Sequence, residues 1–278
     1  MAAVGDNCRA PGLQPGGRVR LWDGTEVPYV EMRPAKASAG GGPLLVFGHG
    51  LTDRKEDDAP ALQRALDMLG EMDPPPPASC VPATVVYDAR GHGESSGWEC
   101  CGPEQFHWRS LAADMLQVGS ALQGPTAAGR DGVLLGGFSM GANSALWAAL
   151  ICPRVVRGLV LLSCTTAWEL RSGRRAKLLE NAEKKRLEDP ARGELLLGAA
   201  RADLPPKEEL RSISVPALIV SARDDPVHPA AMAEQLAELL PDSRLVLVDS
   251  KAELHNAFSH ALVSWLCERF VAPAAAGA

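Results

Sequence analysis

Aromatic residues make up only 5% of the 278 residues, and no apolar run comes near the length that a bilayer-spanning helix needs. The longest apolar runs, near residues 44–47 and 159–162, are a few residues each, so we expect no stable membrane insertion. The first fifteen residues lack a basic segment followed by an apolar stretch, which leaves no readable secretory signal. We therefore expect a cytoplasmic protein.

Basic residues are fewer than acidic ones, with 28 Lys and Arg against 34 Asp and Glu, which gives a formal net charge of −6. A surface of that sign offers no electrostatic footprint for nucleic acid or for anionic lipid. We expect a small-molecule substrate and no nucleic-acid partner, while the oligomeric state is not readable from the sequence.

Cysteine spacing gives no sign of a metal site. The seven cysteines are an odd number, and five of them are scattered without ligand spacing: Cys8, Cys80, Cys152, Cys164 and Cys267. The adjacent Cys100 and Cys101 could form a redox pair, but a disulfide between neighbours is strained, so reduced thiols are favoured. We expect neither a metal nor another cofactor.

What is present is a globular composition, 46% hydrophobic and 22% charged, with 27 glycines and 22 prolines for tight turns. Residues 18–22 and 27–33 predict an antiparallel pair joined at Asp23-Gly24. Continuous aliphatic runs then predict strands covered on both faces, at 44–47, 83–87, 132–135, 158–162 and 217–220. Helical segments alternate with them at 58–72, 106–122, 140–150, 229–240 and 257–270. The pattern predicts one α/β domain over residues 1–278, built on a mostly parallel doubly wound sheet. Ligands of such a sheet bind at the carboxyl ends of its strands.

Two stretches interrupt this alternation. The prolines at 74–77 fit neither a helix nor a central strand, so they predict a surface insertion. Residues 165–211 form a charged, helix-leaning segment that is longer than an ordinary crossover. We interpret this segment as a helical lid over the site, with a plain helical excursion as the alternative.

The sequence Gly137-Phe-Ser139-Met-Gly141 follows a buried strand and opens a helix. A serine on such a sharp strand-to-helix turn is exposed above the sheet and needs residues without bulk two positions before and after it. Ser139 is therefore the candidate nucleophile. The Gly48-His49-Gly50-Leu51 loop ends an earlier strand at the same edge, so the amides of Leu51 and Met140 are the candidate oxyanion hole, and His49 is expected to be structural.

A base and an acid are expected downstream, in the order serine, acid, histidine. We expect His255 to be the base, because it follows the strand at 245–248 and precedes the last helix. His260 falls on the solvent face of that helix, and His228, just before Pro229, is expected to help start a helix. The acid should follow the strand at 217–220, where Asp224 and Asp225 compete on equal terms.

Two further charged groups are expected to lie outside the site. The first, after the strand at 83–87, is interpreted as a packed turn whose charges pair with each other, and it consists of Arg90, His92 and Glu94. The second, at the start of the 165–211 segment, could attract an anionic substrate, but a solvated helix face is the better interpretation: Arg171, Arg174, Arg175 and Lys177.

With these motifs in place, residues 43–270 resemble the α/β-hydrolase superfamily. The resemblance rests on the His49-Gly50 loop, the Asp88-Ala-Arg-Gly-His-Gly-Glu-Ser95 stretch, the turn at Ser139 and a late histidine. Its usual Asp-x-x-Val-Pro pattern places a proline four residues after the acid, which favours Asp225, through Pro229, over Asp224. The stretches 139–142 and 166–169 are similar to small-molecule esterases and enol-lactone hydrolases. The proline insertion and the missing glycine before His255 depart from the pattern.

The resemblance implies a metal-free serine hydrolase acting on an ester, thioester or lactone through Ser139, His255 and Asp225, with the amides of Leu51 and Met140 holding the oxyanion. A cofactor-free carbon–carbon hydrolase or peroxidase on the same residues is one alternative. A ligand-sensing receptor that retains the hydrolase pocket is another.

Overall fold

A computed structural model describes residues 13–14, 16–34, 42–77, 81–123 and 132–270 of the chain. Its strands are β1 Leu13–Gln14, β2 Arg18–Arg20, β3 Glu26–Met32, β4 Leu44–Gly48, β5 Ala83–Tyr87, β6 Val133–Phe138, β7 Val156–Leu162, β8 Ala217–Ala222 and β9 Ser243–Val248. Its helices are α1 Ala59–Glu71, α2 Trp108–Gln123, α3 Met140–Ile151, α4 Ser172–Glu188, α5 Pro190–Arg201, α6 Lys207–Leu210, α7 Ala230–Leu239 and α8 Leu254–Phe270. Short 3-10 turns lie at Pro103–Phe106 and Trp168–Arg171.

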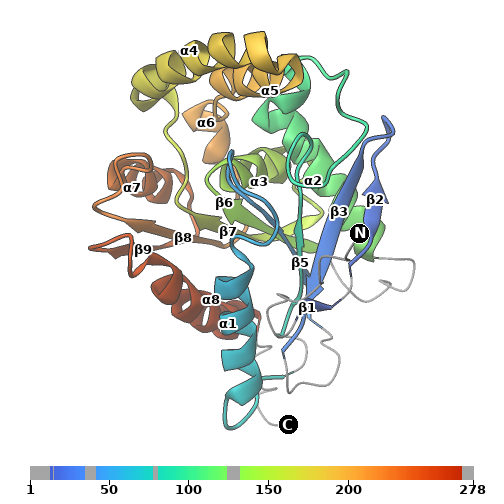
Figure 1. The fold of residues 1–278 in the computed structure, drawn as a ribbon. Coiled ribbons are helices and arrows are strands. Elements are labelled where there is room, and N and C mark those ends of the chain that lie inside the picture. Colours follow the sequence, from blue (N-terminus) through green and yellow to red (C-terminus); the bar gives the residue numbers. More distant parts are fainter. Residues whose placement is uncertain (1–12, 15, 35–41, 78–80, 124–131, 271–278) are drawn as a thin grey trace.

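The sheet runs in the order β1-β3-β5-β4-β6-β7-β8-β9, with β2 paired to β3 (Figure 1). All pairs from β5 through β9 are parallel, whereas β3 is antiparallel to both β1 and β5. The β2–β3 pair is the predicted hairpin, in register at Val19 and Val27. The predicted fold class, a mostly parallel doubly wound sheet with an antiparallel N-terminal hairpin, is confirmed.

Two apolar cores explain why the central strands show no polar alternation. In β4, Leu44 and Val46 face the core formed with α2, α3 and α7, whereas Leu45 and Phe47 face the core formed with α1 and α8. Successive side chains of a strand point to opposite faces, so a strand covered on both sides must be apolar at every position. Helices on both faces leave the carboxyl ends of the strands as the edge at which a site can form.

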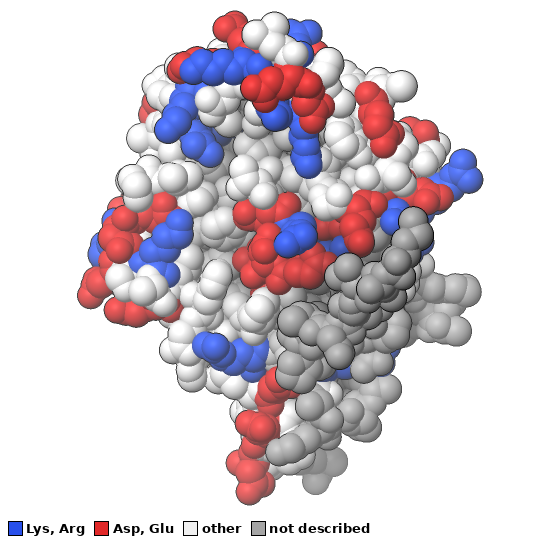
Figure 2. All heavy atoms as spheres, in the orientation of Figure 1, with Lys and Arg blue, Asp and Glu red and all other residues white. Residues whose placement is uncertain are grey.

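The 165–211 segment folds into α4, α5 and α6, which stand beyond the carboxyl edge of the sheet (Figure 1). Charged side chains of both signs cover α4 (Figure 2), where Lys184 pairs with Glu180 and Lys185 with Glu188. The prolines at 74–77 are neither helix nor strand, as predicted.

Five of the cysteines are free thiols, as predicted: Cys100, Cys101, Cys152, Cys164 and Cys267. Cys8, Cys80 and most of residues 1–15 lie outside the described residues. Across the described helices, none combines the length and apolar character needed to cross a membrane.

Candidate active site

Ser139 lies between β6 and α3 with φ 53° and ψ −105°, a left-handed conformation that is rare for a residue with a side chain. A Cβ added at Gly137 would lie 2.5 Å from the Gly48 carbonyl oxygen, and one at Gly141 would clash with the same carbonyl. The two glycines therefore let the turn pack against β4. This geometry agrees with the strained turn expected from the sequence.

His228 lies between Ser139 and Asp225. Its Nε2 is 2.9 Å from the Ser139 hydroxyl oxygen, and its Nδ1 is 2.9 Å from Asp225 Oδ2. The three side chains are buried, and the residues follow β6 and β8 at the carboxyl edge of the sheet. The structure thus brings together a hydroxyl, an imidazole and a carboxylate in one hydrogen-bonded chain.

The prediction that His255 reaches Ser139 is wrong in this geometry. Helix α8 begins at Leu254 rather than at residue 257, so His255 belongs to the helix instead of the loop before it. Its side chain is 55% exposed, with Nε2 3.8 Å from Asp58 Oδ1. His228, expected only to help start a helix, takes the place between serine and acid.

A local turn explains how His228 returns to an aspartate three residues before it. Asp225 Oδ1 accepts hydrogen bonds from the amides of Val227 and His228, at 2.9 and 3.2 Å. This carboxylate-capped turn folds the chain back, so that the imidazole meets Oδ2 of the same carboxylate. The signal in the sequence was a histidine three residues after a candidate acid.

Asp224 has a different role from its neighbour. Its Oδ1 accepts a hydrogen bond of 2.7 Å from the amide of Lys251, which joins the β8 loop to the loop after β9. The Lys251 ammonium lies 3.4 Å from Asp225 Oδ2, so a lysine of this loop, and not a histidine, reaches the carboxylate. Of the two candidate acids, Asp225 is the one that contacts an imidazole.

Electrostatics favour a neutral imidazole beside an ionised carboxylate. Burial lowers the pKa of His228 below its ordinary value, the Asp225 carboxylate opposes this shift, and the charges of Lys251 and Arg174 add to it. Burial alone would raise the pKa of Asp225, but the hydrogen bonds from His228 and Val227 outweigh it and bring the pKa to about 2. His228 is therefore free to accept a proton at neutral pH.

Leu51 and Met140 line one small cavity together with Ser139. Met140 is the first residue of α3, where backbone amides have no partner within the helix. In the described part of the chain, neither the Leu51 amide nor the Met140 amide donates a hydrogen bond to another group. Both are thus free to bind a ligand oxygen.

The loops around Leu51 are held by buried histidines. His49 has Nδ1 2.7 Å from the Gly50 carbonyl and accepts a hydrogen bond from the Ala89 amide, which is the structural role expected for it. His92 lies with its ring nitrogens 2.9 Å from the Arg90 carbonyl and 2.7 Å from the Leu51 carbonyl.

The expectation that the charges of the Asp88–Ser95 stretch pair with each other is wrong for Arg90 and Glu94, whose partners come from other elements. Arg90 forms two hydrogen bonds with Asp114, and Glu94 pairs with Lys55. Among the described residues, no three His, Cys, Asp or Glu side chains gather as metal ligands would.

The prediction of a solvated basic face at the start of α4 is wrong for Arg171. Its side chain is buried, and its guanidinium donates hydrogen bonds to the carbonyls of Thr166, Ala199 and Ala202. The group also stacks on Trp108, with Cζ 4.1 Å from the ring centre. Arg171 thus links the start of α4 to the end of α5.

The other three basic residues differ from one another. Arg175 pairs with Asp203 at 2.8 Å, and Lys177 is exposed as predicted. Arg174 is half-buried and, with Arg171, lines the cavity that contains Ser139.

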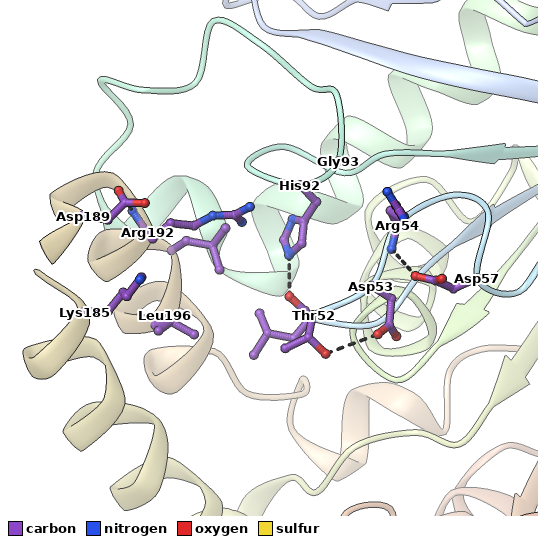
Figure 3. A pocket seen from close by; sticks show the side chains of 12 residues that line it. Thr52, Asp53, Arg54, Asp57, His92, Gly93, Lys185, Asp189, Arg192 and Leu196 are labelled. Atoms are coloured by element: carbon purple, nitrogen blue, oxygen red, sulfur yellow. Dashed lines mark hydrogen bonds between the residues drawn. The ribbon is translucent and has the colours of Figure 1, made fainter. Parts of the chain in front are cut away.

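Two cavities meet at Leu51. The one at Ser139 has a volume of about 20 Å³, which is room for little more than a water molecule. The second, about 680 Å³, lies between the loop after β4 and the helices α4 and α5. Figure 3 shows Lys185, Asp189 and Arg192 on its helical side, facing Asp53 and Asp57.

Asp58 follows Asp57 of the larger cavity and is a buried carboxyl whose Oδ2 has no hydrogen-bond partner. Burial, followed by the charges of Asp53 and Asp57, raises its pKa to about 7. Between about pH 4 and 7 the unfolded chain has lost this proton while the folded chain keeps it, so this group lowers stability as the pH rises. The long, exposed contact with His255 is too weak to offset the effect.

Asp58→Asn should therefore raise the melting temperature at pH 8 by several degrees and change it little at pH 4. The exposed Asp249→Asn is the matched control, and it should change neither value. A melting temperature of Asp58→Asn that is unchanged or lower at pH 8 would show that the carboxylate is accommodated in the fold.

The comparisons with known proteins agree with this architecture. A family model described as alpha/beta hydrolase fold matches residues 43–198, which is more than half of the chain. The chain therefore belongs to the α/β-hydrolase fold family. No curated protein sequence matches it.

Solved structures share the fold at low sequence identity. An esterase (EaEST) from Exiguobacterium antarcticum is 20% identical with a TM-score of 0.69, over 91% of this chain and 99% of that one. A thermophilic esterase from Thermogutta terrifontis is 17% identical with a TM-score of 0.66, over 92% and 100%. A putative non-heme bromoperoxidase, BpoC, from Mycobacterium tuberculosis is 18% identical with a TM-score of 0.63, over 88% and 95%. At this identity the likeness concerns the fold.

Proposed function

We propose that this protein is a serine hydrolase that cleaves an ester, thioester or lactone of a small molecule through an acyl-enzyme. The observation that carries the proposal is the chain of two 2.9 Å contacts from Ser139 through His228 to Asp225. Such a chain activates a hydroxyl that is otherwise a weak nucleophile.

In the first step, the Ser139 hydroxyl attacks the substrate carbonyl while His228 Nε2 takes its proton. Asp225 keeps the other ring nitrogen protonated and stabilises the imidazolium that forms. The amides of Leu51 and Met140 donate to the oxyanion of the tetrahedral intermediate. His228 then returns the proton to the leaving alcohol, thiol or lactone oxygen, and the acyl group remains on Ser139.

In the second step, the same proton transfers take place with water as the nucleophile. His228 removes a proton from the water as it attacks the acyl-enzyme, and gives that proton to Ser139 as the acid product leaves. Each step leaves the protein in its starting protonation state, and no redox partner or metal takes part.

We also propose that the 165–211 segment is a lid. The space at Ser139 is about 20 Å³, smaller than a substrate, and α4 and α5 form part of its wall, so we expect these helices to move when a substrate binds. Shortening the segment should change the ranking of substrates more than the rate on a small acetate ester. A folded variant that keeps the wild-type ranking would make the segment a connector only.

A turnover screen tests the proposal. The purified protein is assayed on 4-nitrophenyl esters of increasing chain length, on lactones and on acyl thioesters, with Ser139→Ala as the blank. We expect multiple turnovers that depend on Ser139 for at least one class. Release of one equivalent followed by arrest would favour the receptor interpretation, and rates equal to the blank throughout would contradict the proposal.

A further inference from the structure

The cavity at Ser139 carries positive charge with no carboxylate in its wall. Its lining is formed by Leu51, Trp108, Ser139, Met140, Thr165, Arg171, Arg174, Leu178 and Ala199. The two arginines are the only residues of this set that are charged at neutral pH. The larger cavity differs, because Asp53, Asp57 and Asp189 stand in it beside Arg54, Lys185 and Arg192.

Arg171 is a buried cation that forms no ion pair within the described residues. The three acceptors of its guanidinium are backbone carbonyls, and one of its faces is covered by Trp108. Asp203, the acid whose charge acts on it, is already paired with Arg175. Burial lowers the pKa of Arg171 to about 10. A buried charge without a counter-ion is costly, so a site that keeps one usually puts it to use.

Arg174 lies three residues after Arg171, in the first turn of α4, and has neither a hydrogen bond nor an ion pair with any described residue. It lines the same cavity as Ser139 and Arg171, and its charge adds to the lowering of the pKa of both His228 and Arg171. Three acids of α4 and α5 already have basic partners: Glu180 pairs with Lys184, Glu188 with Lys185 and Glu194 with Arg186. Arg174 is thus available for a ligand.

We propose that the substrate of this hydrolase carries a carboxylate close to the scissile carbonyl. Arg174 binds this carboxylate, and the positive charge of the buried Arg171 in the same cavity wall adds to the attraction. The substrate class is a half-ester or half-thioester of a dicarboxylic acid, a lactone of a hydroxy dicarboxylic acid, or a hydroxy acid whose hydroxyl is acylated. This inference rests on the proposed function, because it names the substrate of the same site.

The carboxylate also favours the chemistry. Arg174 disfavours the protonated form of His228, which is the form that appears in the transition state. A bound carboxylate neutralises Arg174 and removes that penalty, so the anionic substrate reacts faster than a neutral one of the same shape. A hydrogen-bonded ionic contact of this kind corresponds to a factor of about 10 to 100 in kcat/KM.

Two matched pairs of esters test the proposal. For the acyl side, mono-4-nitrophenyl glutarate is compared with 4-nitrophenyl methyl glutarate. For the leaving-group side, 4-acetoxybenzoate is compared with its methyl ester. Each rate is corrected with Ser139→Ala, which removes hydrolysis by the substrate's own carboxylate. We expect the wild type to prefer the anion by about 10-fold or more in at least one pair.

Arg174→Gln should reduce that preference by about 10- to 100-fold, through slower reaction of the anionic ester and faster reaction of the neutral one, because the charge that disfavours protonated His228 is lost. Arg174→Lys should retain part of the preference. Lys177→Gln, which removes an exposed charge from the same helix, is the control and should keep the wild-type preference. In the Ser139→Ala background, calorimetry with glutarate should show binding that Arg174→Gln weakens by the same order.

The outcomes separate the two proposals. Turnover that depends on Ser139 but favours the neutral esters overturns the anionic substrate and leaves the hydrolase. An anion preference that is unchanged in Arg174→Gln overturns Arg174 as the group that binds the carboxylate, and likewise leaves the hydrolase. Absence of Ser139-dependent turnover on every ester contradicts the hydrolase. In that case, glutarate binding that Arg174→Gln does not weaken overturns the anion site as well.

Discussion

His228→Gln should lower kcat/KM on an activated ester by at least about 10³-fold, whereas His255→Gln should stay within about threefold of the wild type. His228 Nε2 is the only imidazole nitrogen within hydrogen-bond distance of the Ser139 hydroxyl among the described residues. Without it the hydroxyl has no base, and the leaving group has no acid. His255 points to Asp58, so its loss touches neither function.

Each histidine variant serves as the control for the other. Both substitutions replace an imidazole by an amide, and a melting curve on each shows whether the fold is retained. A dead His255→Gln beside an active His228→Gln would mean that the loop after β9 carries the base. In the wild type, the acidic limb of kcat/KM should lie below the ordinary histidine value, because burial lowers the pKa of His228.

Asp225→Asn should lower turnover by about 10⁴-fold, and Asp224→Asn by about tenfold or less. Asp225 accepts from His228 Nδ1 and holds the backbone of the same turn through the amides of Val227 and His228. An amide in its place disfavours the correct tautomer and leaves the imidazolium without its counter-charge. Asp224 binds only the Lys251 amide, so an asparagine oxygen can replace its role.

The pH profile separates a positioning role from plain unfolding. Asp225 opposes the downward shift of the His228 pKa, so removing its charge should lower that pKa further. Residual activity of Asp225→Asn should therefore show an acidic limb at lower pH than the wild type. An unshifted limb with equal losses in both aspartate variants would place the acid elsewhere.

The fold was predictable because its determinants are local and repeated. Strand β4, and β7 from residue 158 onward, have no polar residue since both faces are buried, and that pattern is visible in the sequence. The position of Ser139 was predictable for a similar reason, because Gly137 and Gly141 report the close packing against Gly48. Asp225 was favoured over Asp224 only by the resemblance to a family.

The proposed base, His228, was not predictable from chain order. The sequence places His255 after the last strand, where the family's histidine is expected, and nothing in its pattern reveals that α8 already begins at Leu254. The turn that returns His228 to Asp225 depends on backbone hydrogen bonds to that carboxylate. Likewise, the burial of Arg171 depends on Trp108 of α2, a helix far from it in the sequence. A charged stretch that was expected to be solvated is therefore partly buried.

The most direct test of the account is the labelling of Ser139 by a fluorophosphonate, followed by peptide mass spectrometry. The reagent reports the activated hydroxyl itself, without the need for a substrate. We predict an adduct on the peptide containing Ser139 in the wild type and in His255→Gln at similar rates, and labelling slowed at least about 10³-fold in His228→Gln. Equal labelling of the wild type and His228→Gln, or an adduct on a residue other than Ser139, would contradict the account.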